Sequence, residues 1–305
     1  MTVLLKSAAI IETREPLAAI ARAAELRMAA LVSRRGPQLV QQVDAAVALL
    51  DRAMPGRRYQ DLPEELDDLA VGDALFPAML AARLLAGVSA RCPARLVPDA
   101  VLPELQRQAF RILELQEPSL DDDAFRKDLS ICLLLSFPCA AQMVEQTGAI
   151  PRRTLFTGGP GQALRLGAHL VRTGLRSSPY LEIHAHTPML GDFNPAGWAR
   201  CYDLVAELLA MRPQWLGLVS GSWFYDPVLA RISPRLSYLA DTPLRGGAFR
   251  VRLGASAEDA RLATATSPTR RALVESGSYV PTRWLLVWPR KPLLAWAAGR
   301  RGKQQ

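Results

Sequence analysis

The chain has 305 residues, of which 50% are apolar and 22% are charged, and its formal net charge is +8. This balance excludes a disordered or collagen-like protein. No apolar run reaches the roughly 18 residues that a membrane span needs, which argues against an integral membrane protein. The apolar stretch at residues 7–11 is followed at once by charged residues and is too short for a secretory signal, so we expect a cytoplasmic protein.

The cysteines are few and widely spaced. None of the four forms a Cys-x-x-Cys pair, and four in a chain of this length do not make a disulfide framework. We therefore expect reduced, mostly buried thiols at Cys92, Cys132, Cys139 and Cys201.

The positive charge is concentrated at the carboxyl end. No acidic residue follows Glu275, whereas six basic residues do. The chain has no zinc finger, RNA-recognition signature or base-reading helix, so nucleic acid is not the favoured partner. The six basic residues are Arg283, Arg290, Lys291, Arg300, Arg301 and Lys303.

The same tail contains Trp284, Trp288 and Trp296 among leucines, and two interpretations remain open. Basic residues interleaved with Trp and Leu are typical of an interfacial membrane segment, which favours a peripheral membrane contact. Alternatively, residues 284–288 form a core strand, residues 293–298 form a short packed helix, and the end of the chain is solvated.

Residues 1–150 are predicted to form an α-helical domain, because apolar residues recur there at helical spacing. Arg35, Gly36 and Pro37 end the first helix, and a kink is expected at Pro138. The expected helices span residues 16–34, 38–54, 64–90 (restarting near Pro77), 98–115 and 124–146.

Residues 151–305 are predicted to form an α/β domain, because strand and helix patterns alternate from Arg152 onward. The whole chain is thus α/β (α+β overall), with helices flanking a mixed sheet. The expected strands span residues 154–157, 180–186, 215–222, 249–253 and 284–288, and the expected helices span 162–173, 195–211, 226–239 and 257–275.

The first candidate site lies on the strand at residues 180–186. Because strand side chains alternate, Glu182, His184 and His186 are expected to share one face. If that face is buried, coupling would perturb the pKa values of these groups, as in a general base or a metal site. An exposed strand face, or histidines satisfied by core neighbours, is the alternative.

A metal site is the sharper interpretation of the same residues. Glu182, His184 and His186 would supply nitrogen and oxygen ligands for zinc or non-haem iron, and Asp192 or His169 could complete the set. No His-Glu-x-x-His companion motif fixes a further ligand.

A second candidate cluster follows the strand at residues 215–222. Small residues lead into three aromatics, which suggests a sharp turn beside a ligand, with Ser222 or Tyr225 as a proton donor. The Gly-x-Ser-x-Gly elbow of α/β-hydrolases is absent. The alternative is a strand end whose aromatic residues simply pack.

A glycine-rich loop precedes the helix expected at residues 162–173. The backbone N–H groups around Gly158, Gly159 and Gly161 could hold a phosphate or carboxylate, although neither the Walker A nor the Rossmann pattern is present. A mobile connector is the alternative. Arg270 and Arg271 are among the arginines that could bind an anionic ligand.

The order of strands and helices over residues 180–290, with Ser267–Tyr279 as a late helix and a Gly-aromatic step into a strand, resembles the acyl-CoA-binding half of the GNAT family of N-acyltransferases. The family's pyrophosphate loop does not occur after residues 180–186. The resemblance implies an acyl-CoA or a carrier-bound acyl thioester as cofactor. It also implies Glu182, His184 or His186 as the base that deprotonates an amine, and Tyr225 or Tyr279 as the acid that protonates the thiolate.

The sequence therefore leaves three candidate functions open. The first is an acyltransferase-like enzyme acting on a small amine-bearing substrate. The second is a metal-dependent enzyme built on Glu182, His184 and His186, and the third is a non-catalytic peripheral membrane or binding protein that uses the tail.

Overall fold

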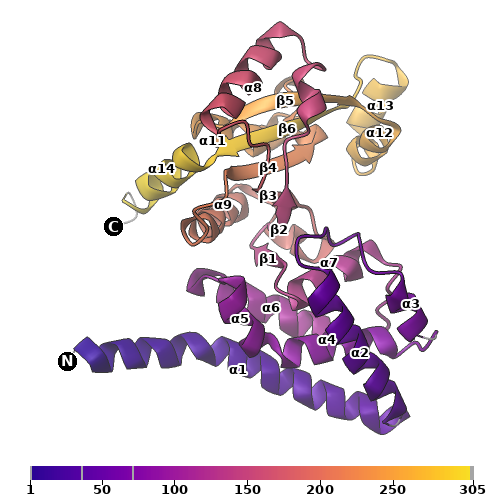
Figure 1. Ribbon diagram of the computed structural model, residues 1–305. Helices are drawn as coiled ribbons and strands as arrows, with labels where there is room; N and C mark the ends of the chain where they lie inside the picture. The colour runs from indigo at the N-terminus through magenta and orange to yellow at the C-terminus, as the bar shows by residue number, and fades with distance from the viewer. Residues whose placement is uncertain (1, 36, 71, 303–305) are drawn as a thin grey trace. The chain divides into compact units, whose positions relative to one another are not determined.

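A computed structural model of the chain describes residues 2–35, 37–70 and 72–302 (Figure 1). Gly36 and Lys303, on which two of the expectations above depend, lie outside the described residues. The fold is mixed α/β and contains two compact units. The first comprises Met1–Gln146 and Ala185–Gly191, and the second comprises Thr147–His184 and Asp192–Gln305.

The first unit is mainly helical, as predicted for the amino-terminal half. Its central helix is α4, Phe76–Ala86, which packs against α1, α2, α6 and α7. Nine of the eleven α4 side chains are buried, because the segment is apolar around its whole circumference. The other helices are α1 (Thr2–Arg35), α2 (Gln38–Ala53), α3 (Glu65–Ala70), α5 (Val88–Arg95), η1 (Asp99–Val101), α6 (Leu102–Leu113) and α7 (Asp123–Cys132).

The helix predicted over residues 124–146 is wrong in its second half. It ends at Cys132, and an antiparallel hairpin follows, formed by β1 (Ser136–Cys139) and β2 (Gln142–Gly148). Pro138 lies within β1 rather than at a helix kink, and it is tolerated there because β1 is the edge strand of the sheet.

The second unit alternates strands and helices, as predicted. Its strands are β3 (Tyr180–His184), β4 (Gly217–Ser222), β5 (Phe249–Ala255) and β6 (Thr282–Pro289). Its helices are η2 (Arg152–Leu155), α8 (Pro160–Arg172), α9 (Pro195–Ala210), η4 (Trp223–Tyr225), α10 (Leu229–Ile232), η5 (Pro234–Leu236), α11 (Tyr238–Arg245), α12 (Ala257–Thr264), α13 (Pro268–Glu275) and α14 (Arg290–Arg301). The strand expected at residues 154–157 is instead the 3₁₀ helix η2 and the turn after it.

The six strands form one mixed sheet in the order β1-β2-β3-β4-β6-β5. Strands β3 and β4 are parallel, and β6 is antiparallel to both β4 and β5. A register shift between Arg252 and Gly254 interrupts the β5–β6 ladder. The sheet is therefore mixed, as the alternating sequence pattern indicated.

Alternation along β6 separates the two faces of the sheet in the second unit. Leu285 and Val287 belong to a core cluster with Leu166 and Leu170 of α8. Leu286 belongs to a different cluster, and Trp288 packs edge-on against Tyr202 of α9. Helix α8 therefore covers one face, while α9, which contacts both α11 and α14, covers the other with them.

The carboxyl-terminal tail is part of the core of the second unit. Trp288 and Leu293 are fully buried, and Trp296 makes edge-on ring contacts with Trp288 and Tyr202. This confirms the packed-strand-and-helix interpretation of residues 284–298. Within the described chain, every helix is too short or too polar to cross a bilayer.

The four cysteines are all buried, as expected.

Candidate functional site

Strand β3 places two candidate residues on one face of the sheet. Its burial alternates from Leu181 to His184, and Glu182 stands in register with Val219 of β4. Val219 belongs to the core cluster on the α8 face, as does Tyr180, two residues before Glu182. Tyr180, Glu182 and His184 therefore point to the α8 face, which confirms that Glu182 and His184 share one side of the strand.

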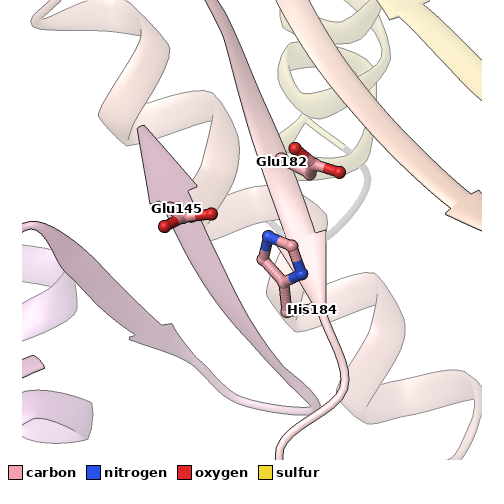
Figure 2. A group of neighbouring side chains, drawn as sticks. All are labelled: Glu145, Glu182 and His184. Carbon is pink, nitrogen blue, oxygen red and sulfur yellow. The ribbon is translucent and has the colours of Figure 1, made fainter. Parts of the chain in front are cut away.

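Glu182 and His184 are half-buried and lie close to each other. A carboxylate oxygen of Glu182 and a ring nitrogen of His184 lie within 4.8 Å of each other (Figure 2). An imidazole nitrogen and a carboxylate oxygen at this spacing are donor types that zinc and non-haem iron accept. Glu145 of β2 is buried and accepts a hydrogen bond of 2.7 Å from the Tyr59 backbone N–H.

His186 has a different environment from His184. Strand β3 ends at His184, so strand alternation does not continue to His186. The His186 Nε2 lies 2.8 Å from the Asp128 Oδ1, and both side chains are almost completely buried. Arg111 also donates to Asp128, so this carboxylate has two cationic or polar partners. The Nδ1 atom of His186 is buried and has no hydrogen-bond partner among the described residues.

Ser222 is the last residue of β4, and Tyr225 is the last residue of the 3₁₀ turn η4 that follows it. The hydroxyl of Tyr225 donates a 2.9 Å hydrogen bond to Ser220, and burial raises the pKa of Tyr225. Tyr225 packs with Leu286, so it lies on the sheet face opposite Glu182. Ser222 caps η4 by accepting a hydrogen bond from the Phe224 N–H. These contacts correspond to the packed-strand-end alternative.

Tyr279 belongs to a separate buried network centred on Asp226. Its hydroxyl donates to Asp226 Oδ2 over 3.4 Å, and the Thr282 N–H donates to the same oxygen over 3.2 Å. Burial, then the Asp226 charge, raises the pKa of Tyr279 well above the normal value. Its hydroxyl therefore shares Asp226 with the Thr282 N–H, at the first residue of β6.

The glycine-rich loop leads into α8, as its sequence suggested. Gly159, at the helix N-cap, has φ +78°, a conformation that glycine adopts without strain. Gly158 is crowded by the side chain of Gln162, which bonds to the backbone of Thr154 and Arg252. Gly161 has open space around it. The loop is thus tied to the edge strand β5.

Arg270 and Arg271 have structural contacts. Arg270 is buried, donates to the Ala263 carbonyl over 2.5 Å and to Ser233 over 3.2 Å, and lies over the Trp223 ring. Arg271 is exposed and donates to the Thr264 carbonyl over 3.4 Å. Burial lowers the pKa of Arg270. The structure uses Arg270 to join α12, α13 and the η5 region.

The two further metal-ligand candidates, His169 and Asp192, lie on different elements. His169 of α8 is buried, and its Nε2 lies 2.6 Å from the Tyr180 hydroxyl. Burial, followed by the charge of Arg172, lowers the pKa of His169. Asp192 ends the 3₁₀ helix η3, Thr187–Asp192, immediately before α9.

Sequence reasoning missed Glu145, Asp128 and Arg111. Glu145 was assigned to a helix, but it lies in β2, where it is buried and accepts a hydrogen bond from the Tyr59 N–H. The sequence signal that could have revealed it is an isolated carboxylate within a segment that is otherwise apolar or neutral from Ile131 to Ile150.

Comparison with known proteins gave no match to a family model, a curated protein or a solved structure.

Proposed function

We propose that this protein is a metal-dependent enzyme that binds a divalent transition-metal ion at Glu182 and His184 of β3. The observation that carries the proposal is the spacing, within 4.8 Å, of the His184 imidazole nitrogen and a Glu182 carboxylate oxygen. A backbone strand fixes the relative positions of Glu182 and His184, which is the preorganisation that a metal site needs.

The donor set indicates which ions and which chemistry to expect. Imidazole suits zinc and iron, whereas carboxylates favour harder divalent ions such as manganese, so we expect zinc, iron or manganese. A divalent ion bound by Glu182 and His184 would keep positions for water, and it would lower the pKa of that water towards neutrality. The reaction class that fits is attack of an activated water on an electrophilic carbonyl or phosphoryl group.

The acyltransferase hypothesis uses the same pair of residues without a metal. His184 lies at the carboxyl end of β3, which is parallel to β4, and ligands bind at such strand ends in open α/β sheets. In this second proposal, Glu182 or His184 would accept the proton of an amine, and acyl-CoA would bind to the metal-free protein.

Titration of apoprotein with Co²⁺, a spectroscopic substitute for zinc, tests the metal proposal. Wild type should develop the visible absorption of a tetrahedral or five-coordinate cobalt site. His184→Ala and Glu182→Gln should lose it or weaken binding by about 10- to 100-fold.

The matched controls carry the same kinds of substitution at positions outside the proposed metal site. His169→Ala, on α8, and Glu258→Gln, at an exposed position of α12, should bind Co²⁺ like wild type. Equal binding by wild type and His184→Ala would refute the metal proposal. A thermal shift with acyl-CoA that His184→Ala abolishes would then support the transferase.

A further inference from the structure

The outer side of helix α8 carries large apolar side chains that the second unit does not cover. Leu164 is 77% exposed and Val171 is 70% exposed. Phe156, just before the glycine-rich loop, is 87% exposed, and Leu175, just after the helix, is 66% exposed. We call these four residues, together with the exposed Ala168, the α8 surface.

The α8 surface is a second apolar face of the helix. Leu164, Ala168 and Val171 follow the spacing i, i+4 and i+7, so they form a stripe along one side. The core side of α8 is formed by different residues, Leu166 and Leu170, which pack on the sheet. In Figure 1, α8 lies at the outside of its unit, beyond β5 and β6. The exposed stripe is thus additional to the contacts that fold the unit.

Arginines flank the stripe, and no acidic residue interrupts them. Residues 146–181 contain no Asp or Glu, although 22% of the whole chain is charged. The five arginines of this segment are Arg152, Arg153, Arg165, Arg172 and Arg176. Arg165 and Arg172 are exposed and lie seven residues apart, which places them together on one side of the apolar stripe.

We propose that the α8 surface binds an anionic membrane surface. An exposed apolar stripe beside arginines is the pattern with which amphipathic helices lie in the headgroup region of a bilayer. The uniformly positive segment complements anionic lipid headgroups. The apolar side chains protrude, as insertion into a bilayer requires.

The α8 surface, rather than the carboxyl-terminal tail, makes the membrane contact in this proposal. In the tail, Trp288 and Leu293 are buried, and Arg300 and Arg301 form ion pairs with Asp203 and Glu207 of α9. Because β6 is packed in the core of the second unit, its tryptophans are not available for insertion into a bilayer. The α8 surface supplies the exposed apolar groups that the tail lacks.

Vesicle co-sedimentation of the full chain tests the proposal. Wild type should bind vesicles containing about 30% phosphatidylserine at least about tenfold better than pure phosphatidylcholine vesicles, and the preference should fall as salt is raised from about 0.1 to about 0.5 M. The double variant Leu164→Gln/Arg165→Glu should lose most of this binding.

A matched control is available on α1. Leu26 is 75% exposed, and the exposed Arg22 lies one turn away, so Leu26→Gln/Arg22→Glu makes the same chemical and charge changes elsewhere. This variant should bind vesicles like wild type. Because all four positions are exposed, both variants should keep the wild-type thermal unfolding midpoint and metal content.

Equal loss of binding in the α8 and α1 variants would overturn the proposal, because it would show that net charge alone causes binding. Equal binding of wild type to both vesicle types would also overturn it. Capture by an acidic polypeptide such as polyglutamate, without vesicle binding, would assign the surface to a protein partner instead.

Discussion

At the residue scale, His169 makes stability depend on pH. Its folded-state pKa lies below the ordinary value because the ring is buried and Arg172 is near. The unfolded chain therefore binds this proton more readily than the folded chain. The contribution of neutral His169 is complete above about pH 6.5 and is lost as pH falls through the folded-state value.

The thermal unfolding midpoint of the wild type should accordingly decrease when the pH is lowered from 7.5 to 5.5. His169→Gln, which does not titrate in this range, should show a smaller fall. Thermal denaturation followed by circular dichroism at both pH values measures the difference. An identical pH dependence in the two proteins would contradict this role of His169.

Gly217 occupies a position where the fold requires glycine. It begins β4 with φ +148°, and a Cβ atom there would lie 2.2 Å from the Trp288 carbonyl oxygen. Gly217→Ala should therefore lower the free energy of unfolding by about 2 kcal/mol or more. Gly161→Ala, where no atom lies within 4 Å, should change it by less than about 0.5 kcal/mol. Urea denaturation of both variants tests the contrast, and a similar cost in each would contradict it.

At the element scale, α14 is a structural helix rather than a detachable tail. Leu293 is fully buried, so Leu293→Ala should destabilise the protein by about 2–5 kcal/mol. Arg301→Ala removes only an exposed ion pair with Glu207 and should cost less than about 1 kcal/mol. Chemical denaturation distinguishes the two, and a Leu293→Ala variant as stable as wild type would show that α14 is not packed.

The hairpin of β1 and β2 shows why part of the fold escaped prediction. All of residues 136–144 are buried, so the segment has neither the helical nor the strand period that exposes one face. Its turn is Ala140–Ala141, with Ala140 at φ +50°, instead of an Asn-Gly pair that would mark a hairpin. Only tertiary burial selects the strand conformation here.

Most strands and helices of the second unit were predictable because their patterns were clear, although the strand expected at residues 154–157 is the 3₁₀ helix η2. Pro and Gly mark the boundaries of α8 and α9, alternation marks β3, and a continuous apolar run marks β6. The pairing of Glu182 with His184 followed from that alternation. The partners of His186, Tyr225 and Arg270 could not be predicted, because each contact joins residues from separate elements, and a single sequence carries no record of such contacts.

At the scale of the whole molecule, a metal ion that binds the folded chain must also stabilise it. Added ligand contributes RT ln(1 + [L]/Kd), about 2.7 kcal/mol when the free ion is at 100 times its Kd. Zinc added to apoprotein should therefore raise the unfolding midpoint of wild type. The shift should be absent in His184→Ala and preserved in His169→Ala. Equal shifts in all three proteins would indicate adventitious binding.

The membrane proposal and the metal proposal use different parts of the second unit. Metal loss in His184→Ala should leave vesicle binding unchanged, and Leu164→Gln/Arg165→Glu should keep its metal. If either variant lost both properties while its unfolding midpoint stayed at the wild-type value, the two sites would not be independent.

The most direct test of the central claim is the metal content of freshly purified protein, measured by mass spectrometry for wild type and His184→Ala side by side. The account predicts near-stoichiometric zinc, iron or manganese in wild type and little in His184→Ala. The same metal content in both proteins, or no metal in either, would contradict the proposed metal centre.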